Sequence, residues 1–190
     1  LQVEVVGHQW WWEFRYPQYT TRTPTGRVDT LVTANDLYLP IGRTANFTLR
    51  TKDVLHSFWI PQLGGKRDLI SNHTNYLWFT PDTSLRTTVF NGSCNEYCGA
   101  SHANMRFRTF VVTPTEFDGW VQQVQSDAPG LQVIPLPRAQ GRSRLAAARA
   151  ARRLIRSTPA DLVLVHDPEL VPWAAGVRSR VPVVWDVHED

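Results

Sequence analysis

Residues 94–105 read Cys94-Asn-Glu-Tyr-Cys98-Gly-Ala-Ser-His102-Ala-Asn-Met105 and place two thiols, an imidazole and a thioether in one short segment. Soft sulfur ligands combined with imidazole select copper over hard cations. Zinc favours four strong ligands, typically two pairs of them, and Cys94 and Cys98 are the only cysteines in the chain. A mononuclear blue copper site uses a single cysteine. Two cysteines with two histidines therefore favour two copper ions bridged by both thiolates.

This segment is too short to surround two metal ions, so a further strong ligand has to come from elsewhere. His56, within Asp53-Val-Leu-His-Ser-Phe-Trp-Ile-Pro61, is the best candidate, because it lies at the end of a predicted strand. Taken singly, a cysteine pair, a methionine or a histidine is more often structural than metal-binding, but their joint spacing favours a metal site. The alternative is a zinc-binding or disulfide-stabilised module, although a disulfide closing so short a loop would remove little chain entropy.

Residues 1–126 have the pattern of an all-β domain. Short alternating or β-branched runs are separated by Gly, Pro, Asn and Asp, as in strands joined by turns. The predicted strands are residues 3–6, 36–41, 45–50, 54–60, 76–79, 87–90 and 107–112. Residues 115–125 predict a short closing helix capped by Thr115. Many short strands at this spacing indicate a β-sandwich or barrel.

The composition changes near residue 127. Only two aromatic residues, Trp173 and Trp185, lie beyond this point, and the basic residues there are all arginines. Strands are predicted at residues 131–136, 161–166 and 182–187, and helices at 143–156 and 169–178. Strands alternating with helices predict a partial α/β, Rossmann-like segment with a parallel sheet. We therefore expect two domains, 1–126 and 127–190.

Composition and charge exclude several classes of protein. A hydrophobic content of 42% is that of an ordinary globular protein. The net charge of +3, from 20 basic and 17 acidic residues, is a modest excess. It is weak evidence for nucleic-acid binding, which usually needs a concentrated basic face. No apolar run of about 18 residues is present that would predict a membrane-spanning helix.

Residues 1–126 resemble the extramembrane copper-A domain of cytochrome c oxidase subunit II. The matching stretches are Gly7-His-Gln-Trp-Trp-Trp-Glu-Phe14, Asp53-Val-Leu-His-Ser-Phe-Trp-Ile-Pro61, Gly65-Lys-Arg-Asp-Leu-Ile70, and the segment from Cys94 to Met105. The resemblance implies a cupredoxin-like β-sandwich with Greek-key topology. It also implies a centre of two copper ions.

The resemblance assigns a role to each site residue. Cys94 and Cys98 would bridge both copper ions, while His56 and His102 would each bind one. Met105 would be a weak ligand to one ion and the backbone carbonyl of Glu96 to the other.

Further roles follow from the same resemblance. The Glu96 carboxylate would reach a magnesium or manganese ion at the boundary with oxidase subunit I. Trp10 would be the surface tryptophan through which electrons from cytochrome c enter, and Asp53 is a candidate docking contact for that donor. His8 and His73 match no ligand role, and at least one of the tryptophans at positions 10–12 is expected to be a packing residue.

The function implied is that of subunit II of a haem-copper oxidase. Such a subunit accepts electrons from cytochrome c and passes them to the haem groups of subunit I, within a proton-translocating complex. It lies on the outer, periplasmic face of a bacterial membrane, held by helices that this chain does not contain. The copper-A domain of nitrous oxide reductase is the main alternative, but it generally has tryptophan where this chain has Glu96.

Residues after about 127 resemble a different family. Gly130–Arg138, Val165–Leu170 and Val183–Asp190 are similar to the N-terminal domain of a family 4, GT-B-type glycosyltransferase. That family's Gly-rich loop and nucleotide-sugar domain find no match in the chain, so we expect no glycosyl transfer. The alternatives are a non-functional fusion with a glycosyltransferase fragment, and a glycosyltransferase for which residues 1–126 form an accessory domain.

Overall fold

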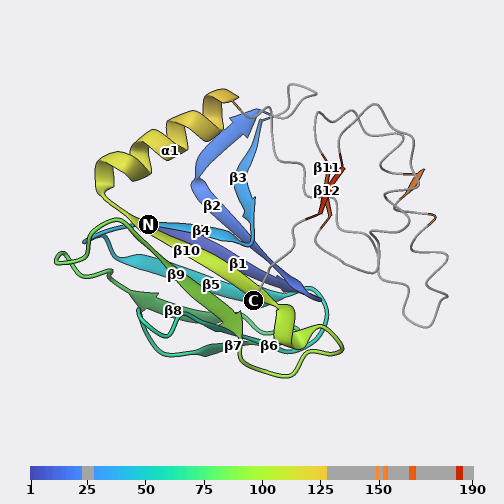
Figure 1. Cartoon of the computed structure of the whole chain (residues 1–190). Coiled ribbons are helices and arrows are strands. Elements are labelled where there is room, and N and C mark those ends of the chain that lie inside the picture. The colour runs from blue at the N-terminus through green and yellow to red at the C-terminus, as the bar shows by residue number, and fades with distance from the viewer. Residues whose placement is uncertain (23–27, 128–148, 150–151, 154–162, 166–182, 186–190) are drawn as a thin grey trace. The chain divides into compact units, whose positions relative to one another are not determined.

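A computed structural model describes residues 1–22, 28–127, 149, 152–153, 163–165 and 183–185 of the 190-residue chain (Figure 1). The chain divides into two compact units, Leu1–Gln132 and Val133–Asp190. The strands of the first unit are β1 (Gln2–His8), β2 (Trp11–Arg22), β3 (Val28–Ala34), β4 (Asp36–Pro40), β5 (Ala45–Thr51), β6 (His56–Trp59), β7 (Arg67–Leu69), β8 (Asn75–Phe79), β9 (Thr88–Cys94) and β10 (Arg106–Val112). Its helices are the 3-10 turn η1 (His102–Asn104) and α1 (Pro114–Asp127).

The first unit is a sandwich of two five-stranded sheets. One sheet has the order β3-β2-β1-β5-β8 and the other β4-β10-β9-β6-β7. Most neighbours are antiparallel, but β1 pairs in parallel with β5, and β10 with β4. Successive strands cross repeatedly between the sheets, in a Greek-key-like manner. The predicted mainly β sandwich is therefore confirmed.

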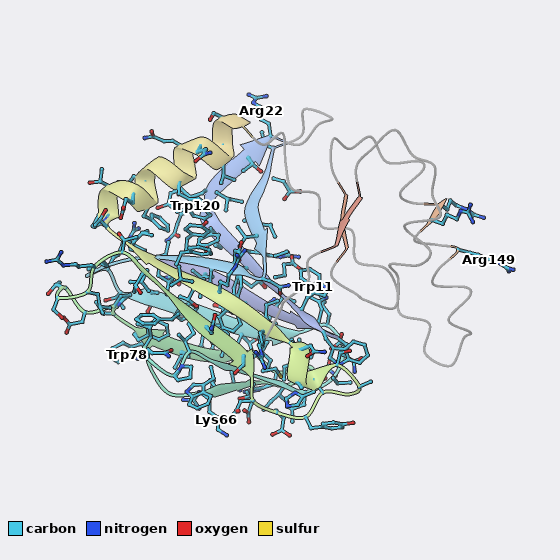
Figure 2. All side chains as sticks on the ribbon, in the orientation of Figure 1. Trp11, Arg22, Lys66, Trp78, Trp120 and Arg149 are labelled. Carbon is cyan, nitrogen blue, oxygen red and sulfur yellow. The ribbon has the colours of Figure 1, made fainter. Side chains whose placement is uncertain are left out.

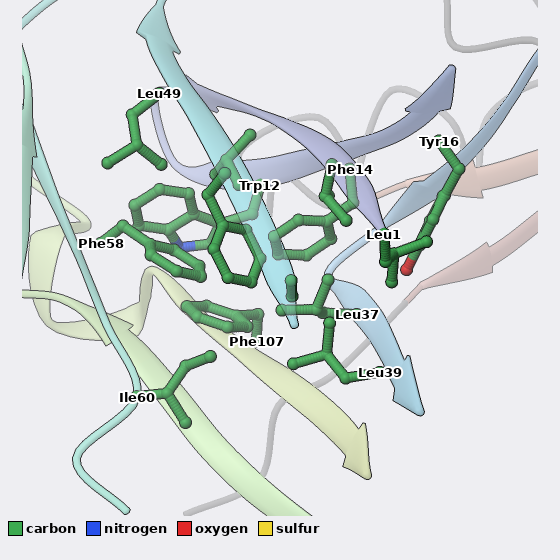
Figure 3. Packing of buried hydrophobic residues seen from close by; sticks show 14 of the residues in the cluster. Leu1, Trp12, Phe14, Tyr16, Leu37, Leu39, Leu49, Phe58, Ile60 and Phe107 are labelled. Atoms are coloured by element: carbon green, nitrogen blue, oxygen red, sulfur yellow. The ribbon is translucent and has the colours of Figure 1, made fainter. Parts of the chain in front are cut away.

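Aromatic side chains fill the space between the two sheets (Figure 3). Trp12 and Phe14 of β2 meet Phe58 of β6 and Phe107 of β10, and all four are fully buried. The rings of Phe58 and Phe107 stack at 5.1 Å, while Trp12 packs edge-on against both. Burying such rings gives a large hydrophobic stabilisation with defined geometry. This core packs β6 and β10 against β2.

Helix α1 packs on the sandwich through Trp120 (Figure 2). The Trp120 ring stacks on Tyr38 of β4 at 4.2 Å and meets Tyr16 of β2 edge-on. Phe117, one turn earlier, is fully buried. The helix thus spans strands that belong to different sheets.

The prediction that Thr115 caps this helix was wrong, because the cap is Thr113. The Thr113 hydroxyl lies 3.3 Å from the Glu116 amide, and the Glu116 carboxylate accepts from the Thr113 amide at 2.8 Å. This reciprocal arrangement is a capping box. Pro114 then occupies the first helical position, where its missing N–H costs nothing.

Three strands were not anticipated from the sequence. These are β2, β3 and β7. The pairing of β2 with β3 shifts register between Tyr16 and Thr20, around Pro17, so the alternation of apolar residues is interrupted there. Strand β7 has only three residues and is defined by its pairing with β6.

The structure describes only a few residues of the second unit. Strands β11 (Val163–Val165) and β12 (Val183–Trp185) pair in parallel, as predicted for residues 161–166 and 182–187. Residues 149, 152 and 153 are helical, within the helix predicted at 143–156. The predicted strand at 131–136 and helix at 169–178 lie outside the described residues. Among those that are described, no helix combines the length and apolar character needed to cross a bilayer.

Gly92 in β9 offers a test of the sandwich packing. It pairs with Phe107 of β10, and a Cβ atom at this position would overlap the Phe107 ring. Gly92→Ala should therefore lower the free energy of unfolding by about 1–3 kcal/mol, as overpacked cores do. Urea unfolding followed by fluorescence measures the change.

The matched control is Gly119→Ala, in an exposed part of α1 where a Cβ atom would meet nothing within 4 Å. Alanine in a helix is favoured over glycine by about 0.5–1 kcal/mol, so this variant should be slightly stabilised. Equal stability of the two variants would contradict the packing described for β9 and β10.

Candidate metal centre

The segment between β9 and β10 is closed by the pairing of these two strands. They run antiparallel, and the Cys94 amide donates to the Met105 carbonyl at 3.0 Å. The first and last sulfur atoms of the segment are therefore brought to its base. Between them, η1 carries His102, and the preceding turn carries Glu96 and Cys98.

Three sulfur atoms lie together inside this segment. The Sγ atoms of Cys94 and Cys98 are 3.8 Å apart, and the Met105 Sδ lies 3.7 Å from the Cys98 Sγ. Both cysteines are free and buried, and Met105 is fully buried. A disulfide has its sulfur atoms at about 2.05 Å, so the cysteines are presented as a dithiol.

His56 approaches the sulfur pair from β6. Strand β6 runs antiparallel to β9, with Phe58 opposite Cys94, and the Asn95 amide donates to the Ser57 carbonyl at 2.9 Å. This places the His56 Nδ1 at 3.8 Å from the Cys94 Sγ. The His56 Nε2 faces the Asp53 carboxylate at 2.8 Å. A carboxylate that accepts from one ring nitrogen leaves the other free to bind metal.

His102 lies beside the other cysteine. Its Nδ1 is 3.5 Å from the Cys98 Sγ, and its ring packs edge-on against Tyr97. The donor atoms of His56, Cys94 and Cys98 all lie within 4.8 Å of one another, and His102 falls outside this group. Each sulfur atom of the pair thus has its own imidazole.

These separations fit donors that share metal ions. With metal–sulfur bonds of about 2.3 Å and metal–nitrogen bonds of about 2.0 Å, two donors on one ion lie roughly 3–4 Å apart. The donor pairs that join each histidine to its sulfur, and the two sulfurs to each other, lie at 3.5–3.8 Å. The backbone carbonyl of Glu96 adds an oxygen 3.2 Å from the Cys94 Sγ. The donor set suits soft, thiophilic metals.

The two thiols of the pair have different pKa values. Burial opposes ionisation of Cys94, but the hydrogen bond with His56 lowers the pKa of this thiol to about 7. Burial and the adjacent Cys94 charge raise the pKa of the Cys98 thiol to about 12. His56 is desolvated, but Asp53 and Cys94 raise its pKa above the usual value. Cys94 therefore ionises before Cys98, and its charge opposes ionisation of the second thiol, since two thiolates this close repel each other.

The Asp53 carboxylate has three hydrogen-bonding partners in the site. Its Oδ1 faces the His56 Nε2, and also accepts from the Val54 amide at 2.7 Å. Its Oδ2 accepts from the Gln9 amide at 2.7 Å. Although burial opposes ionisation, these hydrogen bonds lower the pKa of the Asp53 carboxyl group. The carboxylate thus orients His56, which is a role that the sequence did not suggest.

Trp10 is partly buried beside the metal segment. Its indole Nε1 donates to the Cys98 carbonyl at 3.1 Å. The side-chain amide of Gln9 donates to the same oxygen at 2.5 Å. Sequence reasoning missed Gln9, because nothing in a glutamine between a histidine and three tryptophans signals a contact with residue 98.

The other two tryptophans have structural roles. Trp12 is fully buried, and its Nε1 donates to the Met105 carbonyl at 3.3 Å. Trp11 stacks on His8 at 4.2 Å, and the His8 Nε2 faces the buried Glu13 carboxylate at 2.8 Å. His73 is exposed and pairs with Asn75.

Comparison with known proteins identifies the family of this site. Residues 1–112 match the family model described as cytochrome c oxidase subunit II, periplasmic domain. The chain is 38% identical over 127 residues to cytochrome c oxidase subunit 2 of Alkalihalophilus pseudofirmus, covering 67% of this chain and 33% of the relative. It is 32% identical over 147 residues to the alternative cytochrome c oxidase subunit 2 of Bradyrhizobium diazoefficiens, covering 67% and 52%. The chain thus spans about a third to a half of these relatives.

Solved structures of oxidase subunit II domains are also similar to this chain. The periplasmic domain of cytochrome oxidase subunit II from Bradyrhizobium japonicum superposes with a TM-score of 0.55 and 28% identity, covering 67% of this chain and 94% of that one. A mixed disulfide intermediate between a thioredoxin-like protein and subunit II of cytochrome c oxidase gives a TM-score of 0.52 at 28% identity, covering 67% and 92%.

A second family model, a glycosyl transferase 4-like domain, matches residues 98–190. Its first part overlaps the sandwich, since η1, β10 and α1 lie between residues 98 and 127. The match to the first family covers the metal segment as far as β10, together with all the strands before it. This chain belongs to the cytochrome c oxidase subunit II family, through the periplasmic domain that its residues 1–112 match.

Proposed function

We propose that residues 1–126 form a copper-A domain, which binds two copper ions and passes electrons from cytochrome c to the haem groups of oxidase subunit I. The observation that carries this proposal is the separation of the two histidines. One imidazole lies beside each sulfur of the Cys94–Cys98 pair, and His102 is not within the compact group of the other three donors. A single tetrahedral zinc ion would instead gather four donors around one point.

These distances support a ligand assignment. Cys94 and Cys98 would be shared by the two ions, and His56 and His102 would each hold one of them. Met105 and the Glu96 carbonyl would complete the set as weak ligands. When bound, the copper pair carries one electron shared over two metals.

Contacts within the protein hold these donors in place. Asp53 orients His56, Trp12 holds the Met105 carbonyl, and the strand pairing closes the segment. Such preorganisation limits rearrangement when the charge of the site changes.

Trp10 is proposed as the point where electrons enter. Its indole contacts the Cys98 carbonyl, so one hydrogen bond and the covalent bonds of Cys98 connect it to the bridging sulfur. The donor we propose is cytochrome c.

The proposed setting is the outer face of a bacterial membrane. The family model is that of a periplasmic domain, and the relatives are oxidase subunits, which supports subunit I as the partner. We also propose that the partly exposed Glu96 carboxylate, which accepts from the Tyr97 amide, meets a magnesium or manganese ion at that boundary.

For residues 127–190 we propose no glycosyl transfer. About the first thirty residues of the glycosyltransferase match are folded as part of the sandwich. A chain cannot use these residues in both folds. The expected result is no binding of nucleotide-sugars by isothermal titration calorimetry, and measurable binding would contradict this assignment.

Copper loading provides the first test of the metal centre. The reduced full chain, supplied with copper, should bind two ions per chain and turn purple. Its EPR spectrum should show one unpaired electron shared equally between two copper nuclei. Cys94→Ser removes a bridging sulfur and should abolish this signal.

His73→Ala is the matched control, because His73 is exposed and contacts Asn75 rather than the sulfur pair. This variant should retain the full signal. A spectrum of one type 2 copper in the unmodified chain, or the absence of copper uptake, would refute the binuclear centre.

Asp53→Ala tests whether this carboxylate orients His56 or serves as a docking contact for the electron donor. If Asp53 orients His56, its removal leaves the His56 Nε2 and the Gln9 amide without their acceptor. Copper affinity should then fall by about 10- to 100-fold, as for other partners of metal-binding histidines. Competition with a calibrated copper chelator measures it.

Asp68→Ala serves as control, because Asp68 accepts from Ser57 on the same strand as His56 but contacts no ligand in the described contacts. Unchanged copper affinity in Asp53→Ala, with slower reduction by cytochrome c, would instead assign Asp53 to donor docking.

A further inference from the structure

Gln9 joins the two sides of the metal centre. Its backbone amide donates to Asp53 Oδ2 at 2.7 Å, on the side of His56. Its side-chain Nε2 donates to the Cys98 carbonyl at 2.5 Å, on the side of the bridging sulfur. We propose that Gln9 is a positioning residue that holds the Trp10 indole on the Cys98 peptide and so sets the rate at which electrons enter. This inference rests on the proposed function.

The Cys98 carbonyl is shared by two neighbouring side chains. Trp10 Nε1 donates to it at 3.1 Å, and Gln9 Nε2 donates to the same oxygen. Because a carbonyl oxygen has two lone pairs, it accepts both donors at once. The amide therefore fills one acceptor position and leaves the other for the indole, which restricts where the indole can lie.

Gly99 shows how closely this contact is packed. A Cβ atom at Gly99 would lie 3.0 Å from Gln9 Nε2 and 3.1 Å from Trp10 Cζ2. Its φ of +116° also disfavours any other residue. The two side chains thus pack on the same side of the Cys98–Gly99 peptide, where only a glycine leaves room for both.

The arrangement has a direct consequence for electron transfer. The path from Trp10 to the sulfur crosses one hydrogen bond and then the covalent bonds of Cys98. A change in indole position would lengthen or break that one non-covalent step. The Gln9 side chain meets the metal segment at the Cys98 carbonyl oxygen, which Trp10 also contacts, so it acts through Trp10 and Cys98.

The test uses the full chain with Gln9→Met, which keeps the length of the side chain but removes its amide. The matched control is Gln122→Met, on the exposed face of α1. In the metal-free, ¹⁵N-labelled protein, the Trp10 indole N–H resonance is assigned by its loss in Trp10→Phe. Gln9→Met should shift this resonance and speed its exchange with solvent, whereas Gln122→Met should leave both unchanged.

The copper-loaded proteins give the second readout. Gln9→Met should keep two copper ions and the shared-electron EPR signal, yet its reduction by cytochrome c should slow by roughly 2- to 10-fold, the effect of losing one hydrogen bond worth about 0.5–1.5 kcal/mol. Gln9→Glu retains the chain length and places a carboxylate against the carbonyl, so it should show the same changes even if the methionine variant folds poorly.

An unchanged indole resonance in either folded variant overturns the proposal, as does an unchanged reduction rate with copper intact. Loss of copper from both variants overturns it as well, because Gln9 would then support the metal site itself. If the unmodified chain binds no copper pair, the proposed function fails, while the indole measurement on the metal-free protein still decides the placement of Trp10.

Discussion

The backbone hydrogen bond from Cys94 to the Met105 carbonyl closes the metal segment, and the rest of the site depends on this closure. It extends the pairing of β9 and β10 to the base of the loop, so both ends of the segment are held by a sheet. Cys94 is then fixed beside β6, which brings His56 to it from the neighbouring strand. If this base were open, a dithiol and two imidazoles would have to be ordered by the metal alone, at a considerable cost in conformational entropy.

Three segments far apart in the sequence surround the sulfur pair and brace one another. The turn after β1 provides Gln9 and Trp10. The turn before β6 provides Asp53, β6 itself begins with His56, and the third segment is the metal segment. Hydrogen bonds connect each of these segments to both of the others. A redox centre gains from such mutual bracing, since donors that cannot move contribute little reorganisation when an electron arrives.

Residue spacing predicted the donors but not their supports. The distances between Cys94, Cys98, His102 and Met105 along the chain already imply one compact soft-metal site, because a short segment cannot keep them apart. His56 was found because it was expected at one end of a predicted strand, and it is the first residue of β6. Gln9 and the orienting role of Asp53 depend on which loops meet at one end of the sandwich, and this is decided by tertiary pairing. Strand β7 was missed for a related reason, since it is defined by its pairing with β6. The Thr113 cap is different, because Thr113-Pro-Thr-Glu116 is a capping-box sequence that can be recognised locally.

Residues 98–112 match both family models, and the packing of this stretch decides which fold it belongs to. Phe107 of β10 lies in the aromatic core against Phe58, and Met105 just before it contacts the Cys98 sulfur. Phe117 and Trp120 of α1 bury their rings against the same sandwich. Removing this stretch to complete an α/β domain would take a central strand out of one sheet, along with three of the metal donors, Cys98, His102 and Met105. Strand β10 pairs on both sides, with β4 and β9, so its residues belong to the sandwich. The α/β segment can only use residues that follow α1.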